Sequence, residues 1–137
     1  MNGATLRIYR QILGIGQEDL AERLGYKNRK TIQRWENESW EIPLSAAAEI
    51  EQLFYERIDE IEDYIKAVEE FISDTGKGEP QAINLSIYRS ASSYRRGIGE
   101  SAAGMTWSEH TAKVAQLCAE LTALGYAVNI DYVPSEH

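Results

Sequence analysis

The first part of the chain alternates short helical patterns with glycines. Leu6 and Leu13 mark an apolar face that recurs every three to four residues, which predicts an amphipathic helix. Gly14 and Gly16 interrupt this pattern and end the first helix, since glycine readily adopts the backbone conformations found at helix ends.

Three further helical patterns follow at short intervals. The stretch QEDLAERL predicts a second helix, with Gly25 as its left-handed C-cap. A third helix is expected over about 28–37, with Ile32 and Trp35 pointing inward. Pro43 fits the first turn of a fourth helix.

A longer helical pattern begins near residue 50 and carries a heptad seam. Its apolar positions are spaced four, three, four, three and four residues apart: Phe54, Ile58, Ile61, Ile65, Val68 and Ile72. The other faces carry mostly acids. Two interpretations stay open, a core seam under a solvated acidic face, and a helix that packs against its copy in a dimer.

The pattern after residue 75 changes to that of a small α+β region. TGKGEP (75–80) predicts a connection, and the alternation over 83–87 predicts a strand. Residues 90–105 are rich in Ser, Ala, Gly and Arg and are expected to form a long loop.

A last helix and a last strand complete the pattern. Thr106 and Glu109 form the ends of a predicted capping box, and the helix that they open stops at Gly125. Residues 126–133 alternate again and predict a second strand. Two strands alone are marginally stable, so pairing across a dimer would complete a larger sheet.

Together the patterns predict a mainly α fold with two parts. We expect a helix-turn-helix helical domain over residues 1–54. A long helix and a small α+β (strand-helix-strand) dimerisation region would occupy residues 55–137.

Composition narrows the class of protein. The chain has 137 residues, a net charge of -8 and a single cysteine, Cys118, so no disulfide can form within it. It shows neither a secretory pattern at its start nor an apolar run long enough for a membrane. A globular protein of the reducing cytoplasm is expected.

The charge is distributed unevenly. Residues 1–44 carry seven basic and six acidic residues, whereas residues 45–137 carry seven basic and sixteen acidic ones. Four Lys and Arg residues fall within 27–34, with no acid before Glu36. Since phosphate attraction is local at physiological salt, this cluster matters more than the overall negative charge.

The second and third helices have the framework of a helix-turn-helix. Ala21 allows close helix approach, Gly25 lies in the turn, and Ile32 and Trp35 anchor the third helix. In this motif the later of the two helices, here the third helix of the chain, enters the major groove of DNA. An ordinary basic surface helix is the alternative, and this framework weighs against it.

The residues opposite the anchor are the candidates for contact with DNA. Lys30, Gln33, Arg34 and Asn37 point outward, and Lys27, Asn28 and Arg29 lie at the entrance to the helix. Arg and Gln can bind guanine and adenine edges in a bidentate manner, whereas Lys and Asn more often hold phosphates. Gln17, at the start of the second helix, is placed to contact a phosphate.

The stretch LRIYRQILGIGQEDLAERLGYKNRKTIQRWEN resembles the Cro/cI-type (XRE) helix-turn-helix, over about residues 4–54. Three departures from the usual form LTQEELAEKLGVSxxTIxRWENG are visible. The turn between Gly25 and Ile32 holds one extra residue, Gly16 replaces the usual Ser or Thr cap, and WENESWEIP replaces WENG.

The W-E-N to I-P run, the acidic helix, and the later IYRS and TWSEHTAKVAQLCAELTALGY are similar to the YdiL-like group, which includes anti-CRISPR-associated repressors of phages. This resemblance implies a homodimeric autorepressor that binds double-stranded DNA at an inverted-repeat operator. Carried over by position, the base contacts fall on Arg29, Lys30, Gln33 and Arg34. The phosphate contacts fall on Gln17 and Asn37, with Arg10 as a further candidate.

Two other interpretations concern partners. SASSYRRG (90–97) is either an ordinary mobile surface loop or a second nucleic-acid contact, for DNA or RNA, through Tyr94, Arg95 and Arg96. The rival function is an antitoxin-like interaction protein, whose acidic helix neutralises a basic partner while DNA binding is secondary.

Catalytic and metal sites are not expected. His110 and His137 lack Cys or carboxylate neighbours at zinc-ligand spacing, and Cys118 lies on an apolar helix face. The acids of residues 49–74 lie on a helix exterior with no pocket for acid–base chemistry. The sequence predicts no enzyme, cofactor or metal.

Overall fold

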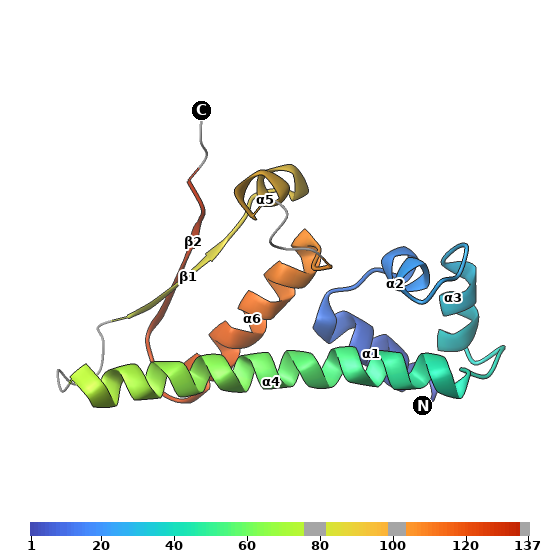
Figure 1. Ribbon diagram of the computed structural model, residues 1–137, viewed down its shortest axis with the longest axis horizontal. Coiled ribbons are helices and arrows are strands. Elements are labelled where there is room, and N and C mark those ends of the chain that lie inside the picture. Colours follow the sequence, from blue (N-terminus) through green and yellow to red (C-terminus); the bar gives the residue numbers. More distant parts are fainter. Residues whose placement is uncertain (76–81, 99–103, 135–137) are drawn as a thin grey trace. The chain divides into compact units, whose positions relative to one another are not determined.

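The described part of the chain forms six helices and two strands in two compact units. A computed structural model describes residues 1–75, 82–98 and 104–134. The elements are α1 (Gly3–Leu13), α2 (Gln17–Arg23), α3 (Lys30–Glu36), α4 (Leu44–Thr75), β1 (Ile83–Ile87), α5 (Ala91–Ile98), α6 (Trp107–Ala123) and β2 (Val128–Tyr132). The mainly α class is confirmed (Figure 1).

Helix α4 contributes to both units. Unit 1 comprises Met1–Ile58 and unit 2 comprises Asp59–His137. This division lies four residues after the boundary expected at residues 54 and 55. Among the described residues, no helix is long and apolar enough to cross a membrane.

Unit 1 is built around one buried cluster to which all four of its helices contribute. Leu6 of α1 and Ile32 of α3 are fully buried, and Leu20 of α2 and Ile50 of α4 are nearly so. Their spacing places one apolar side chain from each helix at the centre, which is the arrangement expected of amphipathic helices.

Two helix ends in unit 1 follow the glycine pattern of the sequence. Gly14 has φ 73° and Gly25 has φ 84°, both in the left-handed region. After α2, the N–H of Tyr26 donates to the carbonyl of Ala21 (2.8 Å), and the Gly25 N–H donates to Glu22 (3.1 Å). This is a Schellman motif, so the prediction for Gly25 is confirmed.

Two helix starts differ slightly from the prediction. α3 begins at Lys30 rather than near residue 28, because the Asn28 side chain accepts the backbone N–H of Lys30 (2.9 Å) in a turn. α4 begins at Leu44, one residue after Pro43. The carbonyl of Pro43 accepts the N–H of Ala47 (2.9 Å), so the proline precedes the first helical residue.

The heptad seam of α4 is divided between the two cores. Phe54 packs against the cluster of unit 1, and its ring stacks on Tyr9 with centroids 3.9 Å apart. Ile61 is buried in unit 2, and Ile65 and Val68 pack against the same cluster. The structure therefore gives these seam positions core roles within the chain, while the acids on the other faces are exposed.

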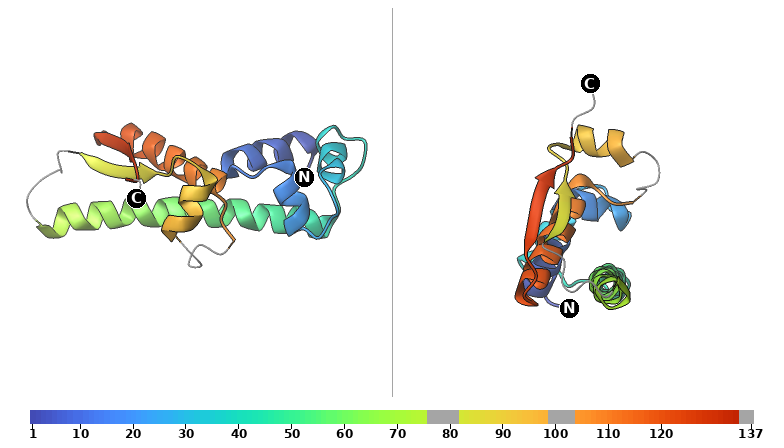
Figure 2. Two further views of the ribbon diagram at one scale, coloured as in Figure 1. Left: turned by 90° about the horizontal axis from the view of Figure 1, so that it is seen from above. Right: turned by 90° about the vertical axis from the view of Figure 1, so that its left-hand side faces the viewer.

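Unit 2 contains a two-stranded parallel sheet and the helices that connect its strands. β1 and β2 pair from Ile83 with Val128 to Ile87 with Tyr132, and the strands lie side by side in each view (Figures 1 and 2). α6 packs more extensively against β1 than against β2. Both strands were predicted, and their parallel pairing follows from the helices that link them.

The expectation of a long loop over 90–105 is wrong for its first part. Residues 91–98 form α5, which opens with a reciprocal cap. The Ser90 side chain accepts the Ser93 N–H, and the Ser93 side chain accepts the Ser90 N–H (3.1 Å each). Serine satisfies helix ends as readily as it forms loops, so a Ser-rich stretch can also begin a helix.

The last helix begins and ends as predicted. The Thr106 side chain accepts the N–H of Glu109, and the Glu109 carboxylate accepts the N–H of Thr106. Gly125, which follows the C-cap residue Leu124, adopts φ 95°. Val114 and Leu121 are buried, and Cys118 packs against the same cluster. The connection expected over 75–80 lies outside the described residues from position 76 onward.

Candidate nucleic-acid interface

Exposed polar residues of α3, of the turn before it and of its C-cap form one surface. We call this the α3 surface: Lys27, Asn28, Arg29, Lys30, Gln33, Arg34 and Asn37, all of them exposed. On the opposite side Ile32 is fully buried and Trp35 is 2% exposed. The prediction that these two residues point inward is confirmed. The cations lie on the opposite, exposed side of the helix and take no part in the core.

Trp35 ties α3 to the rest of unit 1. The ring of Tyr26, from the turn, meets its ring edge-on with centroids 5.2 Å apart. Gly3, at the start of α1, lies so close that an added Cβ would be 2.4 Å from the Trp35 carbonyl and 2.5 Å from that of Glu36. The end of α3 therefore rests directly on the α1 backbone.

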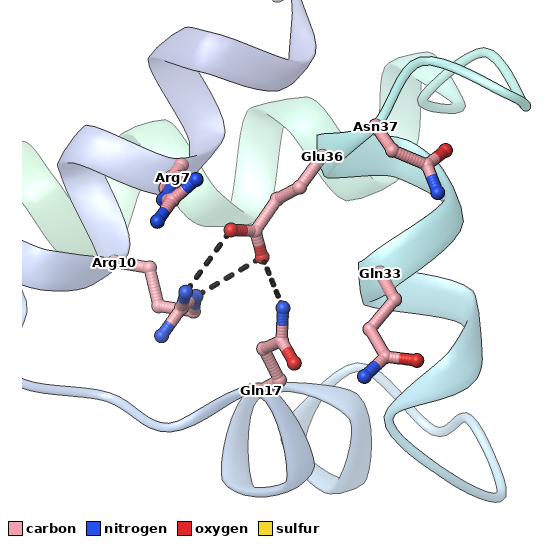
Figure 3. A pocket seen from close by; sticks show the side chains of 6 residues that line it. All are labelled: Arg7, Arg10, Gln17, Gln33, Glu36 and Asn37. Atoms are coloured by element: carbon pink, nitrogen blue, oxygen red, sulfur yellow. Dashed lines mark hydrogen bonds and ion pairs between the residues drawn. The ribbon is translucent and has the colours of Figure 1, made fainter.

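A charged network joins the first three helices (Figure 3). The Arg10 side chain donates to both carboxylate oxygens of Glu36, at 3.1 and 3.0 Å. It also donates to the carbonyl of Ile15 (3.2 Å). The Gln17 amide donates to Glu36 Oε2 (3.1 Å). A bidentate pair of this kind fixes orientation as well as adding energy, so α3 is held in one position relative to α1 and α2.

This network changes the interpretation of two predicted phosphate contacts. The Arg10 and Glu36 side chains are only 16% and 8% exposed, and the positive charge of Arg10 is matched by Glu36. Arg10 and Gln17 thus have a structural role in holding α3. Contact of either residue with a phosphate remains a prediction.

A hollow of about 620 Å³ lies beside this network. It is lined by Arg7, Arg10, Gln17, Gln33, Glu36 and Asn37. Figure 3 shows Gln33 of α3 across this space from Arg7 and Arg10 of α1, whereas the side chain of Asn37, the C-cap of α3, points away from the two arginines. The hollow is polar and adjoins the α3 surface, as a groove for a phosphodiester backbone would be.

Arg7 is the site residue that sequence reasoning missed. It lies three residues before Arg10 on α1, so the two share a helix face. Among the described residues Arg7 forms no ion pair and it is exposed, unlike Arg10. Its helical spacing from Arg10 is the sequence signal that could identify it, since Arg7 lies outside the basic cluster at 27–34.

The turn after α3 is closed by hydrogen bonds and one unusual backbone angle. The Ser39 N–H donates to the Arg34 carbonyl (2.9 Å) and the Glu38 N–H to the Trp35 carbonyl (3.1 Å), a second Schellman motif. Glu38 holds the left-handed position with φ 65°. Asn37 Oδ1 accepts from the Ser39 N–H (2.9 Å) and hydroxyl (2.6 Å).

This turn brings an aromatic ring to the α3 surface. The guanidinium carbon of Arg34 lies 4.3 Å from the ring centroid of Trp40, which is 49% exposed. The sequence singled out Arg34 but gave Trp40 no role. The missing information was the Schellman turn, which folds residue 40 back onto the helix.

The second nucleic-acid contact was predicted for a flexible loop, but this segment of unit 2 is helical. Tyr94 lies on α5, is 4% exposed and donates its hydroxyl to the Met105 carbonyl (3.1 Å). It is therefore not available to stack on a base. Arg95 and Arg96 are exposed, and contact of these two with RNA or DNA remains a prediction.

Two titratable groups of unit 2 have shifted pKa values. Burial, with the nearby charges of Glu109 and Tyr88, raises the pKa of Tyr94. Burial, with the charge of Lys113, lowers the pKa of His110. The rings of His110 and Tyr94 lie 5.4 Å apart. No group of three or more His, Cys, Asp or Glu residues able to hold a metal occurs in the described ranges, and His137 lies outside them.

Comparison with models of protein families identifies a family for this chain. A family model described as Aca2/YdiL-like covers residues 1–124, which include all of unit 1 and unit 2 as far as the end of α6. No curated protein matches the chain. The resemblance to the YdiL-like, anti-CRISPR-associated group is thereby confirmed.

Proposed function

The chain belongs to the Aca2/YdiL-like family, and on that premise we propose that it is a sequence-specific, DNA-binding transcriptional regulator. Family membership indicates a regulator in the anti-CRISPR context. The finer proposal is a cytoplasmic homodimeric repressor, of phage or chromosomal origin, that occupies an inverted-repeat operator. It acts by binding and not by catalysis.

The observation that carries this proposal is the contrast between the two sides of α3. Ile32 and Trp35 are buried, while Arg29, Lys30, Gln33 and Arg34 are exposed together. In the major groove, Arg can bind guanine O6 and N7, and Gln can bind adenine N6 and N7. Each good bidentate pair contributes about 1–3 kcal/mol of discrimination against the wrong base.

The polar hollow supports a place for the DNA backbone next to the bases. Arg7 supplies an exposed cation there, and Asn37 supplies an exposed amide. Phosphate contacts fix the register of a protein on DNA but do not read its sequence. Arg7→Ala is therefore expected to weaken binding to all sequences alike and to reduce its salt dependence by about one counterion.

The incomplete sheet of unit 2 supports a homodimer. Parallel sheets are normally covered on both faces, yet β2 is mostly exposed, with Ile130 at 42% and Tyr132 at 50%. A second copy that packs on β2 would cover these side chains. Two α3 helices related by a two-fold axis would then read half-sites about one helical turn apart, or a multiple of it.

The function is tested by selecting bound duplexes from a random DNA pool at physiological salt. We expect an enriched inverted repeat. Arg34→Ala and Arg29→Ala should each relax the preference at one position, at a cost of about 1–3 kcal/mol. Lys66→Ala, which removes an exposed cation from α4 in unit 2, is the matched control and should leave the selected sequence unchanged.

Binding without an enriched sequence would contradict the proposal. Only charge-driven affinity would remain, and a protein partner of the exposed acidic face of α4 would become the better hypothesis. In that case a pulldown from the native host should recover a partner in equal amounts.

The dimer is tested separately by light scattering on the purified chain. Ile130→Asp combined with Tyr132→Asp should convert a dimer to a monomer, because two charges would be buried in the interface. Leu44→Asp is the control, since Leu44 is 88% exposed and lies in unit 1. A dimer that survives the double change would place the interface elsewhere.

A further inference from the structure

We infer that Trp40 is a positioning residue of the α3 surface, which holds the Arg34 guanidinium ready to read one base pair. This inference rests on the proposed function and deepens it. Trp40 acts on DNA through Arg34 and is not itself the group that reads the base.

The first observation is the contact between the two side chains. The guanidinium carbon of Arg34 lies over the Trp40 ring, 4.3 Å from its centroid. Arg34 is exposed and Trp40 is 49% exposed, so the contact lies at the surface. Trp is the best partner for a cation–π interaction, and Arg is its most frequent cation.

The second observation is that the backbone places the ring independently of any ligand. The Trp40 N–H donates to the carbonyl of Arg34 itself (3.2 Å), and the Ser39 N–H donates to the same oxygen (2.9 Å). The same Ser39 N–H also donates to Asn37 Oδ1 (2.9 Å). Arg34 therefore holds the Trp40 backbone through its carbonyl and contacts the Trp40 ring through its guanidinium.

The third observation is that Trp40 has no comparable role in the core. Trp35, five residues earlier, is 2% exposed and belongs to the buried cluster of unit 1. Trp40 is outside that cluster. It falls in the NESW stretch, where the chain departs from the Cro/cI-type form. A large aromatic side chain kept at a polar surface is most simply explained by the cation that it contacts.

The two interactions required of Arg34 are compatible in chemical terms. A cation–π contact uses the face of the guanidinium plane, whereas a bidentate contact with guanine O6 and N7 uses N–H groups at its edge. A free Arg side chain loses rotamer freedom when DNA binds. A ring that already restricts Arg34 reduces this loss, and the gain applies to the one base pair that Arg34 reads.

The experiment compares three substitutions by equilibrium binding to the selected operator and to duplexes changed at one base pair. Trp40→Ala should weaken operator binding by about threefold to tenfold, and it should flatten the preference at the same base pair as Arg34→Ala. Trp40→Phe keeps an aromatic face and should retain most of the preference. Trp40→Leu keeps bulk alone and should behave like Trp40→Ala.

Two controls separate positioning from general damage. Tyr55→Ala removes a ring of similar exposure, 56%, from α4 in unit 1 and should not change the preference. Thermal unfolding of each variant checks the fold. In the free protein, the Arg34 Hε resonance should show an upfield ring-current shift in the wild type and in Trp40→Phe, which Trp40→Leu removes.

A double-mutant cycle decides the outcome. In an Arg34→Ala background, adding Trp40→Ala should change operator binding by less than about twofold, because the coupled pair is already lost. If Trp40→Ala weakens every duplex equally, also without Arg34, the ring contacts DNA itself and the positioning role is overturned. An unchanged preference in Trp40→Ala overturns it too, with the proposed function intact. A wild-type chain without any preferred sequence would instead overturn the proposed function.

Discussion

The two units distribute their buried and exposed residues differently. In unit 1, every helix contributes to one cluster, and the ends of α1, α2 and α3 are closed by hydrogen bonds. In unit 2, β1 is buried at Ile83 and Leu85, but β2, its only partner among the described strands, is mostly exposed. The core of unit 1 is closed within one chain. In the sheet of unit 2, β1 is covered and β2 is mostly exposed.

This difference indicates which surface of each unit is available to bind another molecule. Unit 1 has its core on one side of α3, so the cations on the other side are available to a polyanion. Unit 2 instead exposes apolar side chains at Ile130 and Tyr132 on a parallel sheet, and such surfaces are usually covered. Under the proposed function, the first unit would contact phosphates and bases, and the second would contact protein.

The largest effect is expected from Trp35→Ala. Trp35 is 2% exposed and contacts both Tyr26 and the start of α1, and removal of a buried aromatic ring costs about 3–5 kcal/mol. Chemical denaturation should show this loss. Amide hydrogen exchange should show that protection falls in α1 to α3 more than in α6. A variant that unfolds like the wild type would contradict the central place of Trp35 in unit 1.

Gly3→Ala tests whether the close approach of α1 and α3 is required. The new methyl group would lie 2.4 Å from the Trp35 carbonyl, a backbone atom that can move only with α3. We expect a loss of about 1–3 kcal/mol in the free energy of unfolding. Gly16→Ala is the matched control, because no atom lies within 4 Å of its added Cβ. Equal stabilities of the two variants would refute a tight contact at Gly3.

Glu38 tests the cost of the left-handed residue in the turn. Glu38→Gly and Glu38→Ala both remove the carboxylate that accepts the Gly3 N–H (3.3 Å), so their difference isolates the φ angle of 65°. We expect the glycine variant to be more stable by about 1 kcal/mol. Urea denaturation measures this difference, and a more stable alanine variant would show that φ 65° carries no strain.

The smallest effect is expected from the pH dependence of unit 2. Burial lowers the pKa of His110 below its usual 6.5, so the unfolded chain takes up this proton first as the pH falls. The contribution of neutral His110 to stability is present above pH 6.5 and is lost below it. His110→Phe should reduce the fall in denaturation midpoint between pH 7.5 and about 5. A fall of unchanged size would exclude His110 as its cause.

Much of the local structure could be predicted because it depends on residues close in sequence. Gly25 and the Thr106–Glu109 box mark helix ends by their own backbone and side-chain chemistry. Ile32 and Trp35 were assigned to the core from helical periodicity alone. The α3 surface then followed as the opposite face of the same helix.

The rest depended on contacts between distant residues. The ion pair of Arg10 with Glu36 spans 26 positions and gives a predicted phosphate ligand a structural role that its position in the sequence does not indicate. Tyr94 reaches Met105 and stabilises a helix whose composition reads as loop. Trp40 could not be placed without knowing that Glu38 would adopt a left-handed angle usually left to glycine.

The register of β1 with β2 also has a consequence for the order of folding. Asn84 pairs with Asn129, 45 positions away in the chain, and contacts between residues distant in sequence form late because a long loop must close first. In unit 1, by contrast, the turns and helix ends close over three to six residues. Unit 1 emerges first from the ribosome and should fold first. We therefore expect a nascent chain to acquire its α3 surface before β2 completes the sheet, so the apolar surface of unit 2 is the last to mature.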